Sequence, residues 1–335
     1  MPESGHVPVL LEPVLRLLAP QTGEVAVDCT AGRGGHAAAL AARLGPTGTL
    51  VAVDLDEGNL AYVESRLRDA AVEGGAPRFV ALHGSFADAP ARLIEAGLTA
   101  DVVLADLGFS SIHVDDPARG FSFAAEGPLD MRYDRSRGRT AAELLRAFSE
   151  RELTEMLLHL GEEPLAAKIA GKIAQVRRRE PIETTRQLAG LVEEAYGARA
   201  RYARLHPATR TFMALRIAVN DELNALSTLL RQVGEEAERV AAKGAAAEAA
   251  GWLRCGSRVA IIAFHSLEDR LVKHAFASAA GRGLAARLTR RPVVADDAEL
   301  AANPRARPAK LRAIALGHAE DRVHGEDSGR EDDDG

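Results

Sequence analysis

Three carboxylates stand at the ends of short apolar runs in the first third of the chain, and their placement is the first indication of chemistry. Asp28 closes the run E-V-A-V-D, Asp54 closes T-L-V-A-V-D, and Asp106 closes a run that begins at residue 101. Carboxylates can face a cation, accept hydrogen bonds from ribose hydroxyls or take up a proton. If the runs are parallel strands, all three lie at the same edge of one sheet, where ligands bind.

A glycine-rich turn, V-D-C-T-A-G-R-G-G-H-A-A-A-L at residues 27–40, joins the first two runs. Gly32, Gly34 and Gly35 are expected to let the backbone turn tightly and approach a ligand closely. A helix that begins near His36 would add free backbone N–H groups. A turn that binds nothing is disfavoured because the neighbouring strand ends also carry polar residues.

The glycines do not decide which nucleotide binds, because the turn also fits the dinucleotide pattern G-x-G-x-x-A. Asp28 would face the positively charged amino acid part of S-adenosylmethionine and would repel a pyrophosphate. Asp54 is placed to accept hydrogen bonds from a ribose, and Phe86 offers an aromatic face beside the adenine. We favour S-adenosylmethionine as the cofactor, with an NAD-dependent oxidoreductase as the alternative.

The elements that must position these residues follow from the pattern of the chain. Apolar runs alternate with helical segments, which predicts an α/β fold: a doubly wound, mostly parallel, Rossmann-like sheet. The expected strands are residues 24–28, 49–54, 78–82, 101–105 and 258–264. S/T-x-x-E/Q helix starts at Thr140, Ser149 and Thr184 predict a small helical domain inserted into the sheet domain.

We therefore predict four regions. The sheet domain takes up residues 1–110 and 206–316, a loop and the inserted helical domain take up 111–205, and an acidic tail takes up 317–335. The tail carries eight acidic residues against two arginines and almost no apolar residues, so it is expected to be disordered. It accounts for the whole net charge of -6, which leaves the rest of the chain balanced.

An irregular segment at residues 106–132, rich in glycine, proline, phenylalanine and arginine, is a candidate substrate lip. Phe121 and Phe123, beside Arg119, could stack on splayed-out bases, and Arg132 could meet a phosphate. The alternative is that the two phenylalanines plug the core beneath the lip.

Basic residues gather in three stretches: residues 177–179, 303–312 and 197–216, the last with five arginines and no acid. Such clusters suit a polyanion, although a solvated helix face is the alternative. Within the third, Arg210 is a candidate RNA contact, and a helical pattern places Arg216 and Asn220 on a face toward the lip.

The last strand run ends at His265, which is either a substrate contact or a packed histidine. The following Ser266, with Asp269 three residues later, predicts a helix N-cap.

Two cysteines, Cys29 and Cys255, fit a reducing compartment, and we expect no disulfide and no metal site. Cys29 is interpreted as a small buried packing residue. No apolar run approaches the roughly 18 to 20 residues of a membrane span, and the N-terminus lacks the pattern of a signal peptide. A cytoplasmic protein with no membrane partner is expected.

The residues after the fourth strand narrow the choice of acceptor atom. Methylation of a pyrimidine ring carbon needs a thiolate nucleophile, and no cysteine stands there. An exocyclic amine or a hydroxyl is the more plausible acceptor. Asp106, with Ser110 and Ser111 beside it, is placed to orient an amine and take its proton.

Taken together, these motifs resemble the bacterial 16S ribosomal RNA cytosine-N4 methyltransferases, the RsmH family formerly called MraW. The similarity runs through H-V-P-V-L-L, G-R-G-G-H, D-L-G-F-S-S, R-G-F-S-F, G-P-L-D-M-R, H-P-A-T-R-T-F, F-H-S-L-E-D-R and N-P-R-A-R to about residue 316. The resemblance implies a methyltransferase domain with an inserted substrate domain. It also implies action on the N4 amine of one decoding-centre cytidine of 16S rRNA in the small ribosomal subunit.

Matched position by position, the resemblance places donor contacts on seven residues: Gly34, Gly35, His36, Asp54, Phe86, Asp106 and His113. The last match is imperfect, because the family commonly has glutamine where this chain has His113. A non-enzymatic interpretation, a small-subunit assembly factor that keeps the donor pocket as a relic, remains as a further alternative. A homodimer is left open.

Overall fold

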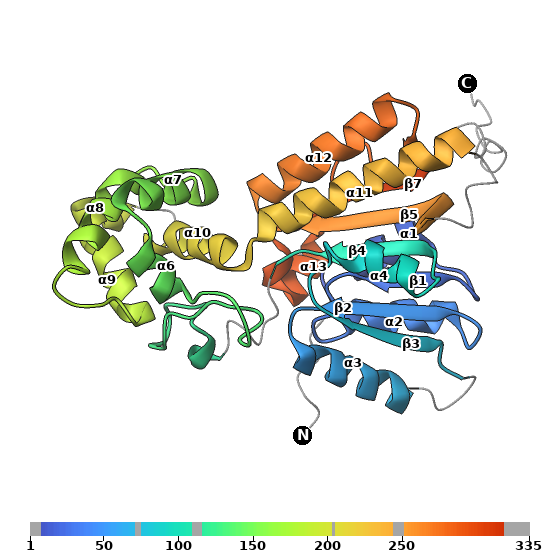
Figure 1. The fold of residues 1–335 in the computed structure, drawn as a ribbon, viewed down its shortest axis with the longest axis horizontal. Coiled ribbons are helices and arrows are strands. Elements are labelled where there is room, and N and C mark those ends of the chain that lie inside the picture. Colours follow the sequence, from blue (N-terminus) through green and yellow to red (C-terminus); the bar gives the residue numbers. More distant parts are fainter. Residues whose placement is uncertain (1–7, 71–74, 109–115, 203–204, 244–250, 318–335) are drawn as a thin grey trace, which may run out of the picture. The chain divides into compact units, whose positions relative to one another are not determined.

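The computed structural model describes residues 8–70, 75–108, 116–202, 205–243 and 251–317 (Figure 1). By its internal contacts the chain divides into two compact units, one made of Met1–Leu107 with Ser227–Gly335 and the other of Gly108–Leu226. The predicted site residues Ser110, Ser111 and His113 lie outside the described residues, as does the acidic tail from residue 318 onward.

The first unit contains a seven-stranded sheet in the order β3-β2-β1-β4-β5-β7-β6. Strands β1 to β5 are parallel, and β7 runs antiparallel to β5 and β6, which confirms the mostly parallel, doubly wound prediction. The strands are β1 (Val25–Asp28), β2 (Thr49–Asp54), β3 (Arg78–His83), β4 (Ala100–Asp106), β5 (Leu253–Ala263), β6 (Ala285–Arg287) and β7 (Lys310–Leu316). Asp28, Asp54 and Asp106 therefore end three parallel strands at one edge.

Strand β5 begins five residues before the apolar run that predicted it. Leu253 pairs with Ala100 of β4, and the register then shifts before Arg258 pairs with Val102. Ser257 lies in this irregularity and donates from its hydroxyl to the carbonyl of Ala100. The polar residues of the bulge interrupt the apolar pattern, so the sequence hides the first part of the strand.

Helices α1 (Leu11–Leu18), α2 (Gly35–Leu44) and α3 (Glu57–Ala70) bury their apolar faces in one cluster with residues of the sheet. Helix α12 (Ser266–Gly281) packs against β5, β6 and β7. The other elements of this unit are α4 (Ala89–Glu95), α13 (Asp297–Ala302) and most of α11 (Glu222–Lys243). Buried apolar residues on successive strands of the sheet account for the apolar runs in the sequence.

The second unit is a bundle of helices drawn in green to yellow in Figure 1. Its α-helices are α6 (Ala141–Ala147), α7 (Glu150–Gly161), α8 (Ala166–Val176), α9 (Thr185–Tyr196) and α10 (Ala208–Asn220). The three predicted helix starts are confirmed as reciprocal capping boxes. The side chains of Thr140, Ser149 and Thr184 each accept a hydrogen bond from the backbone three residues on.

Helix α10 packs within the helical unit, whereas the sequence placed its residues in the second part of the sheet domain. Phe212, Ala214 and Leu215 of α10 belong to the same buried cluster as the helices α6 to α9. The unit boundary at Leu226 lies inside α11 rather than before α10. Among the helices of the described ranges, none combines the length and the apolar character needed to cross a membrane.

Candidate active site

The loop between β1 and α2 is held against its neighbouring strands by backbone hydrogen bonds. The N–H of Cys29 donates to Leu104 of β4, and the N–H of Ala31 donates to Val53 of β2. Gly32 and Gly34 both have a positive φ, +48° and +70°, and Gly34 is the N-cap of α2. Any other residue would strain the backbone at these two positions.

At position 35, close packing against a neighbouring residue leaves room only for a glycine. A Cβ at this position would lie 2.6 Å from the Cγ of Pro8. Pro8 therefore fills the space on the Cβ side of Gly35, and a contact between the Gly35 backbone and a ligand stays a prediction.

Asp54 shapes the same loop through both of its carboxylate oxygens. Oδ2 accepts from the N–H of Gly32 at 2.8 Å, and Oδ1 accepts from the N–H of Asp56 at 2.8 Å. Each oxygen has a second lone pair with which a ribose hydroxyl could be bound. The predicted adenine neighbour, Phe86, is half-buried in the turn after β3.

Thr30 ties the ends of β1 and β4 together, a role that the sequence analysis missed. Its N–H donates to Asp28 Oδ1 at 3.1 Å, and its hydroxyl oxygen accepts from the N–H of Asp106 at 2.7 Å. Neither a helical nor a strand periodicity singles out Thr30 in the sequence. Its position two residues after Asp28 was the available signal for this role. Thr30 thus fixes the spacing of the two strand-end carboxylates.

Asp28 is buried, with 1% of its surface exposed, and its Oδ2 has no hydrogen-bond partner. Burial raises the pKa of Asp28 to about 7, and the nearby charge of Asp54 adds to the shift, while the hydrogen bonds from Thr30 oppose it. A buried carboxylate with an unpartnered oxygen is costly for the fold. A cation or a proton would stabilise it.

Asp106 is more accessible than Asp28. Its side chain keeps 24% of its surface exposed, yet its Oδ1 is buried and has no hydrogen-bond partner among the described residues. Desolvation raises the pKa of Asp106 well above its usual range, and the charges of Asp28 and Glu268 raise it further. The pKa of each carboxyl is raised in part by a nearby carboxylate, Asp54 for Asp28 and Asp28 for Asp106, so positive charge bound beside them would favour their ionised forms.

His36 contacts Asp106 through one ring nitrogen and the backbone through the other. Its Nε2 lies 3.0 Å from the carbonyl oxygen of Val9, and its Nδ1 lies 3.5 Å from Asp106 Oδ2. A carbonyl only accepts, so Nε2 carries the ring proton and the Nδ1 lone pair faces Asp106. The structure thus places His36, predicted to contact the methyl donor, against the carboxylate of Asp106.

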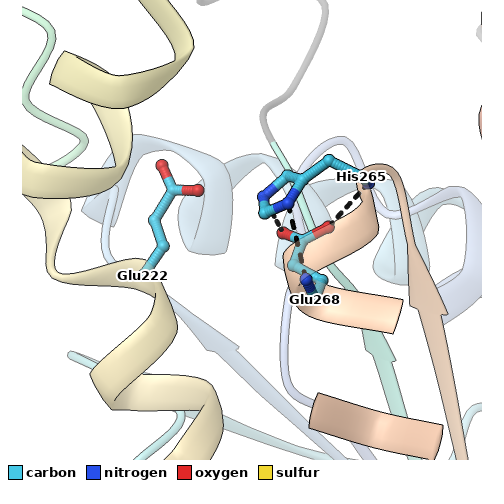
Figure 2. Close-up of side chains that lie close together, drawn as sticks. All are labelled: Glu222, His265 and Glu268. Atoms are coloured by element: carbon cyan, nitrogen blue, oxygen red, sulfur yellow. Dashed lines mark hydrogen bonds and ion pairs between the residues drawn. The ribbon is translucent and has the colours of Figure 1, made fainter. Parts of the chain in front are cut away.

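His265 is the N-cap of α12, as Figure 2 shows from its position beside Glu268. The N–H of Glu268 donates to His265 Nδ1, and Glu268 Oε2 accepts from the N–H groups of Phe264 and His265. The prediction of Ser266 as the N-cap is wrong by one residue, because an imidazole nitrogen supplies the capping acceptor. The predicted cap partner Asp269 instead binds Arg312 and Lys310.

The arginines of the lip hold the lip itself. Arg119 Nη2 donates to the carbonyls of Arg132 and Tyr133 at 3.0 and 2.9 Å. Arg132 makes a two-pronged ion pair with Asp130, with 2.7 Å from Nε to Oδ1 and 3.0 Å from Nη2 to Oδ2. This pairing lowers the pKa of Asp130 and raises that of Arg132. Both predicted RNA contacts therefore have structural partners already.

Asn220 and Arg216 of α10 behave in the same way. Asn220 faces the lip as expected, because its Oδ1 accepts from the N–H of Tyr133 and its Nδ2 donates to the carbonyl of Met131. Arg216 is buried and pairs with Glu222 through two hydrogen bonds of 2.9 Å. Arg210 is exposed and donates to the carbonyl of Glu162.

Phe121 and Phe123 pack against other rings of the helical unit. Phe121 stacks on Tyr133 with ring centroids 5.4 Å apart. Phe123 stacks on His206 at 4.4 Å and meets Phe212 edge-on at 5.0 Å. Both phenylalanines lie partly buried against the apolar core of the unit, which favours the core-plug alternative over bases stacked on these rings.

The 177–179 cluster is partly structural. Arg177 donates to the carbonyls of Leu145 and Phe148. A cavity of about 150 Å³ lies beside it, lined by Ala142, Leu145, Arg146, Arg177, Arg179, Glu180, Pro181 and Ile182. Its volume is below the roughly 300–1,000 Å³ of pockets that take drug-sized ligands.

Cys29 is confirmed as a buried residue, with 2% of its surface exposed. Burial raises the pKa of its thiol, and the neighbouring Asp28 raises it further. The thiol stays protonated and unreactive.

The comparisons with known proteins agree with one another. A family model described as "MraW methylase family" matches residues 3–316. Three curated relatives are each named "Ribosomal RNA small subunit methyltransferase H". The protein from Trichlorobacter lovleyi is 44% identical and covers 93% of this chain and 98% of its own length. The relative from Nitratidesulfovibrio vulgaris is 44% identical, and the match covers 92% of this chain and 84% of the relative. The relative from Thermomicrobium roseum is 43% identical, and the match covers 92% of each chain.

Proposed function

Because the chain belongs to the MraW methylase family, we propose that it transfers the methyl group of S-adenosylmethionine to the N4 amine of a decoding-centre cytidine in 16S rRNA. The names of the relatives support ribosomal RNA of the small subunit as the substrate. The observation that carries the proposal is the pair of carboxylates, Asp28 and Asp106, which end parallel strands and each keep a buried oxygen without a partner.

The residues present fit the methyl donor. S-adenosylmethionine carries an ammonium and a sulfonium group, and Asp28 Oδ2 is a buried acceptor that lacks a partner. A cationic group placed there would offset the cost of burying the carboxylate. The turn at Gly32 and Gly34, Asp54 and Phe86 would hold the rest of the donor, as the sequence predicts.

When bound, the donor supplies an electrophilic methyl group. Asp106 orients the acceptor amine by accepting a hydrogen bond from it, which aligns the nitrogen lone pair with the methyl. The nitrogen–carbon bond would form as the methyl–sulfur bond breaks and the sulfur keeps the electron pair, and the amine nitrogen, which becomes positive, would release a proton to Asp106. The raised pKa makes Asp106 a stronger base toward the proton of the amine than an ordinary exposed aspartate.

His36 acts in this scheme as a positioning residue. Its Nε2 bond to Val9 fixes the ring, so that Nδ1 faces Asp106 Oδ2. This nitrogen can accept a hydrogen bond from Asp106 once the carboxylate has taken up the proton of the amine. Ser110 and Ser111 remain predicted neighbours of the amine.

The alternatives receive less support. Membership of a methylase family gives no ground for an NAD-dependent oxidoreductase. A catalytically silent assembly factor that keeps the donor pocket would have the same two carboxylate oxygens, and the absence of methyl transfer by purified protein would identify it. The proposal includes a cytoplasmic enzyme that acts on rRNA within the small subunit.

The test is nucleoside analysis of 16S rRNA after incubation with purified protein and labelled S-adenosylmethionine. Assembled small subunits and naked rRNA are compared, and N4-methylcytidine is the expected product. Calorimetric titrations with S-adenosylmethionine and with NAD accompany the assay. Binding of NAD in place of S-adenosylmethionine, or label on another nucleoside, would contradict the proposal.

A further inference from the structure

The 3-10 helix η2 (Gly197–Tyr202) exposes an aromatic ring to solvent. Tyr202 has 88% of its surface exposed and Leu205, just after it, has 60%. Among the described residues, Tyr202 is the one aromatic side chain in the set of exposed large hydrophobic residues. An aromatic ring that gains nothing from burial in the fold is available to a partner.

Described residues on either side of η2 are held within the helical unit by hydrogen bonds and ring contacts. On one side, the hydroxyl of Tyr196 donates to Glu163 Oε1 at 2.8 Å. On the other side, His206 Nε2 lies 3.0 Å from Glu193 Oε1, and the His206 ring stacks on Phe123. The rings that flank the segment are thus anchored to the helical unit, whereas Tyr202 is not.

Two arginines accompany the exposed ring. Arg199 and Arg201 are exposed and share η2 with Tyr202, and residues 197–216 contain no acid. Some other exposed arginines of this unit have acidic partners, as in Arg151 with Glu155 and Arg186 with Glu126. Within the parts of the unit that the structure describes, the Arg199 and Arg201 side chains form no ion pair.

We infer that Arg199, Arg201 and Tyr202 form a contact site for a single-stranded segment of the RNA substrate. The Tyr202 ring stacks on an unpaired base, and the two guanidinium groups pair with the flanking phosphates. The combination of an exposed ring with unpaired cations and no acid matches the charge and the stacking surface of RNA. The inference rests on the proposed function for the identity of the RNA.

The first measurement is the Kd for naked 16S rRNA, obtained by filter binding with wild type, Tyr202→Ala and Tyr202→Phe. Tyr202→Ala is expected to weaken binding about 5- to 150-fold, the range for the loss of one stacked base. Tyr202→Phe keeps the ring and should bind like wild type. Because Tyr202 is exposed, neither change should affect folding, which thermal unfolding checks.

The second measurement is the salt dependence of binding. The double variant Arg199→Ala/Arg201→Ala should lower the slope of log K against log salt by about 1.4, since each phosphate contact to a single strand contributes about 0.7. The control, Arg151→Ala/Arg186→Ala, removes two exposed arginines of the same unit that already have acidic partners. Its slope should change by much less.

Equal RNA affinity of wild type and Tyr202→Ala would overturn the inference, as would equal salt slopes for the two arginine double variants. If the variants lose binding to a ribosomal protein but not to RNA, the site takes a protein and the inference is also wrong. Failure of the proposed function is seen separately, as the absence of N4-methylcytidine with wild-type enzyme. RNA binding is measured independently of methyl transfer, so Tyr202→Ala could still show a loss of RNA affinity in that case.

Discussion

Two strand-end carboxylates of the sheet unit and three polar residues of the helical unit use their hydrogen-bonding capacity in opposite ways. Asp28 and Asp106 each keep one buried oxygen without a partner. In the helical unit, Arg132 and Arg216 form two-pronged ion pairs, and Asn220 binds the lip backbone through both ends of its amide. The first set is incomplete without a ligand, whereas the second is complete.

This difference separates residues that await a ligand from residues that stabilise the fold. A buried polar group without a partner costs free energy, and where it also ends a parallel strand, the edge at which ligands bind, it marks a candidate ligand site. An arginine beside an irregular loop looks like a phosphate contact in the sequence. The structure gives Arg132 and Arg216 carboxylate partners instead, and their substitution should first affect stability.

The largest effect is expected for Asp106→Asn. The amide keeps the shape but cannot take the proton, so methyl transfer should fall about 10²- to 10⁴-fold. Single-turnover transfer of labelled methyl to small subunits measures it. Asp88→Asn changes an exposed acid of the same unit as a control and should transfer like wild type. Unchanged transfer by Asp106→Asn would remove Asp106 from the mechanism.

Arg216→Met tests whether the ion pairs of the helical unit stabilise the fold. It leaves Glu222 in a partly buried position without its cation, which should cost about 3–5 kcal/mol in the free energy of unfolding. Urea unfolding measures the loss, and Arg210→Met, at an exposed position, should cost much less. If Arg216→Met unfolds like wild type but binds rRNA poorly, Arg216 is an RNA contact after all.

The pH dependence of donor affinity tests Asp28. Its pKa is raised from 3.8 to about 7, so in the free protein it holds a proton at pH 5 and releases it near neutrality. A cationic donor prefers the ionised form, so affinity should rise up to tenfold per pH unit below about pH 7 and level off above it. Calorimetry from pH 5.5 to 8 measures this.

In Asp28→Asn this pH dependence should disappear and donor affinity should be low throughout. The same titration affects the folding stability of the free protein in the opposite direction: stability falls as the pH rises, whereas donor affinity rises. A raised pKa means that the contribution of Asp28 to the free protein is present below pH 4 and is lost as the pH rises through 7. A pH-independent donor affinity in wild type would show that Asp28 does not face a cation.

The smallest effect is expected for Thr184→Ala, which removes the N-cap of α9. The side chain of Thr184 accepts from the N–H of Gln187, and its loss should cost about 1 kcal/mol of unfolding free energy. Thr154→Ala is the matched control, because the Thr154 hydroxyl bonds within its own helix. Equal stability of the two variants would mean that the caps of the helical unit contribute little.

Much of the sheet unit could be predicted from the sequence because its signals are local. Buried parallel strands appear as short apolar runs, and Asp28, Asp54 and Asp106 mark their ends directly. The capping boxes at Thr140, Ser149 and Thr184 join residues three positions apart, so they too can be recognised without a fold. The family followed from motifs of the same local kind.

The partners of the long polar side chains could not be predicted in this way. Asn220 meets Tyr133 across 87 positions of the chain, and Gly35 makes room for Pro8, which precedes helix α1. His265 was a candidate site residue until Glu268 showed it to be a helix cap. The residue types that could do chemistry were determined by the sequence. Which of them remained without a partner was decided by the tertiary structure, because hydrogen bonds are formed between residues that only folding brings together.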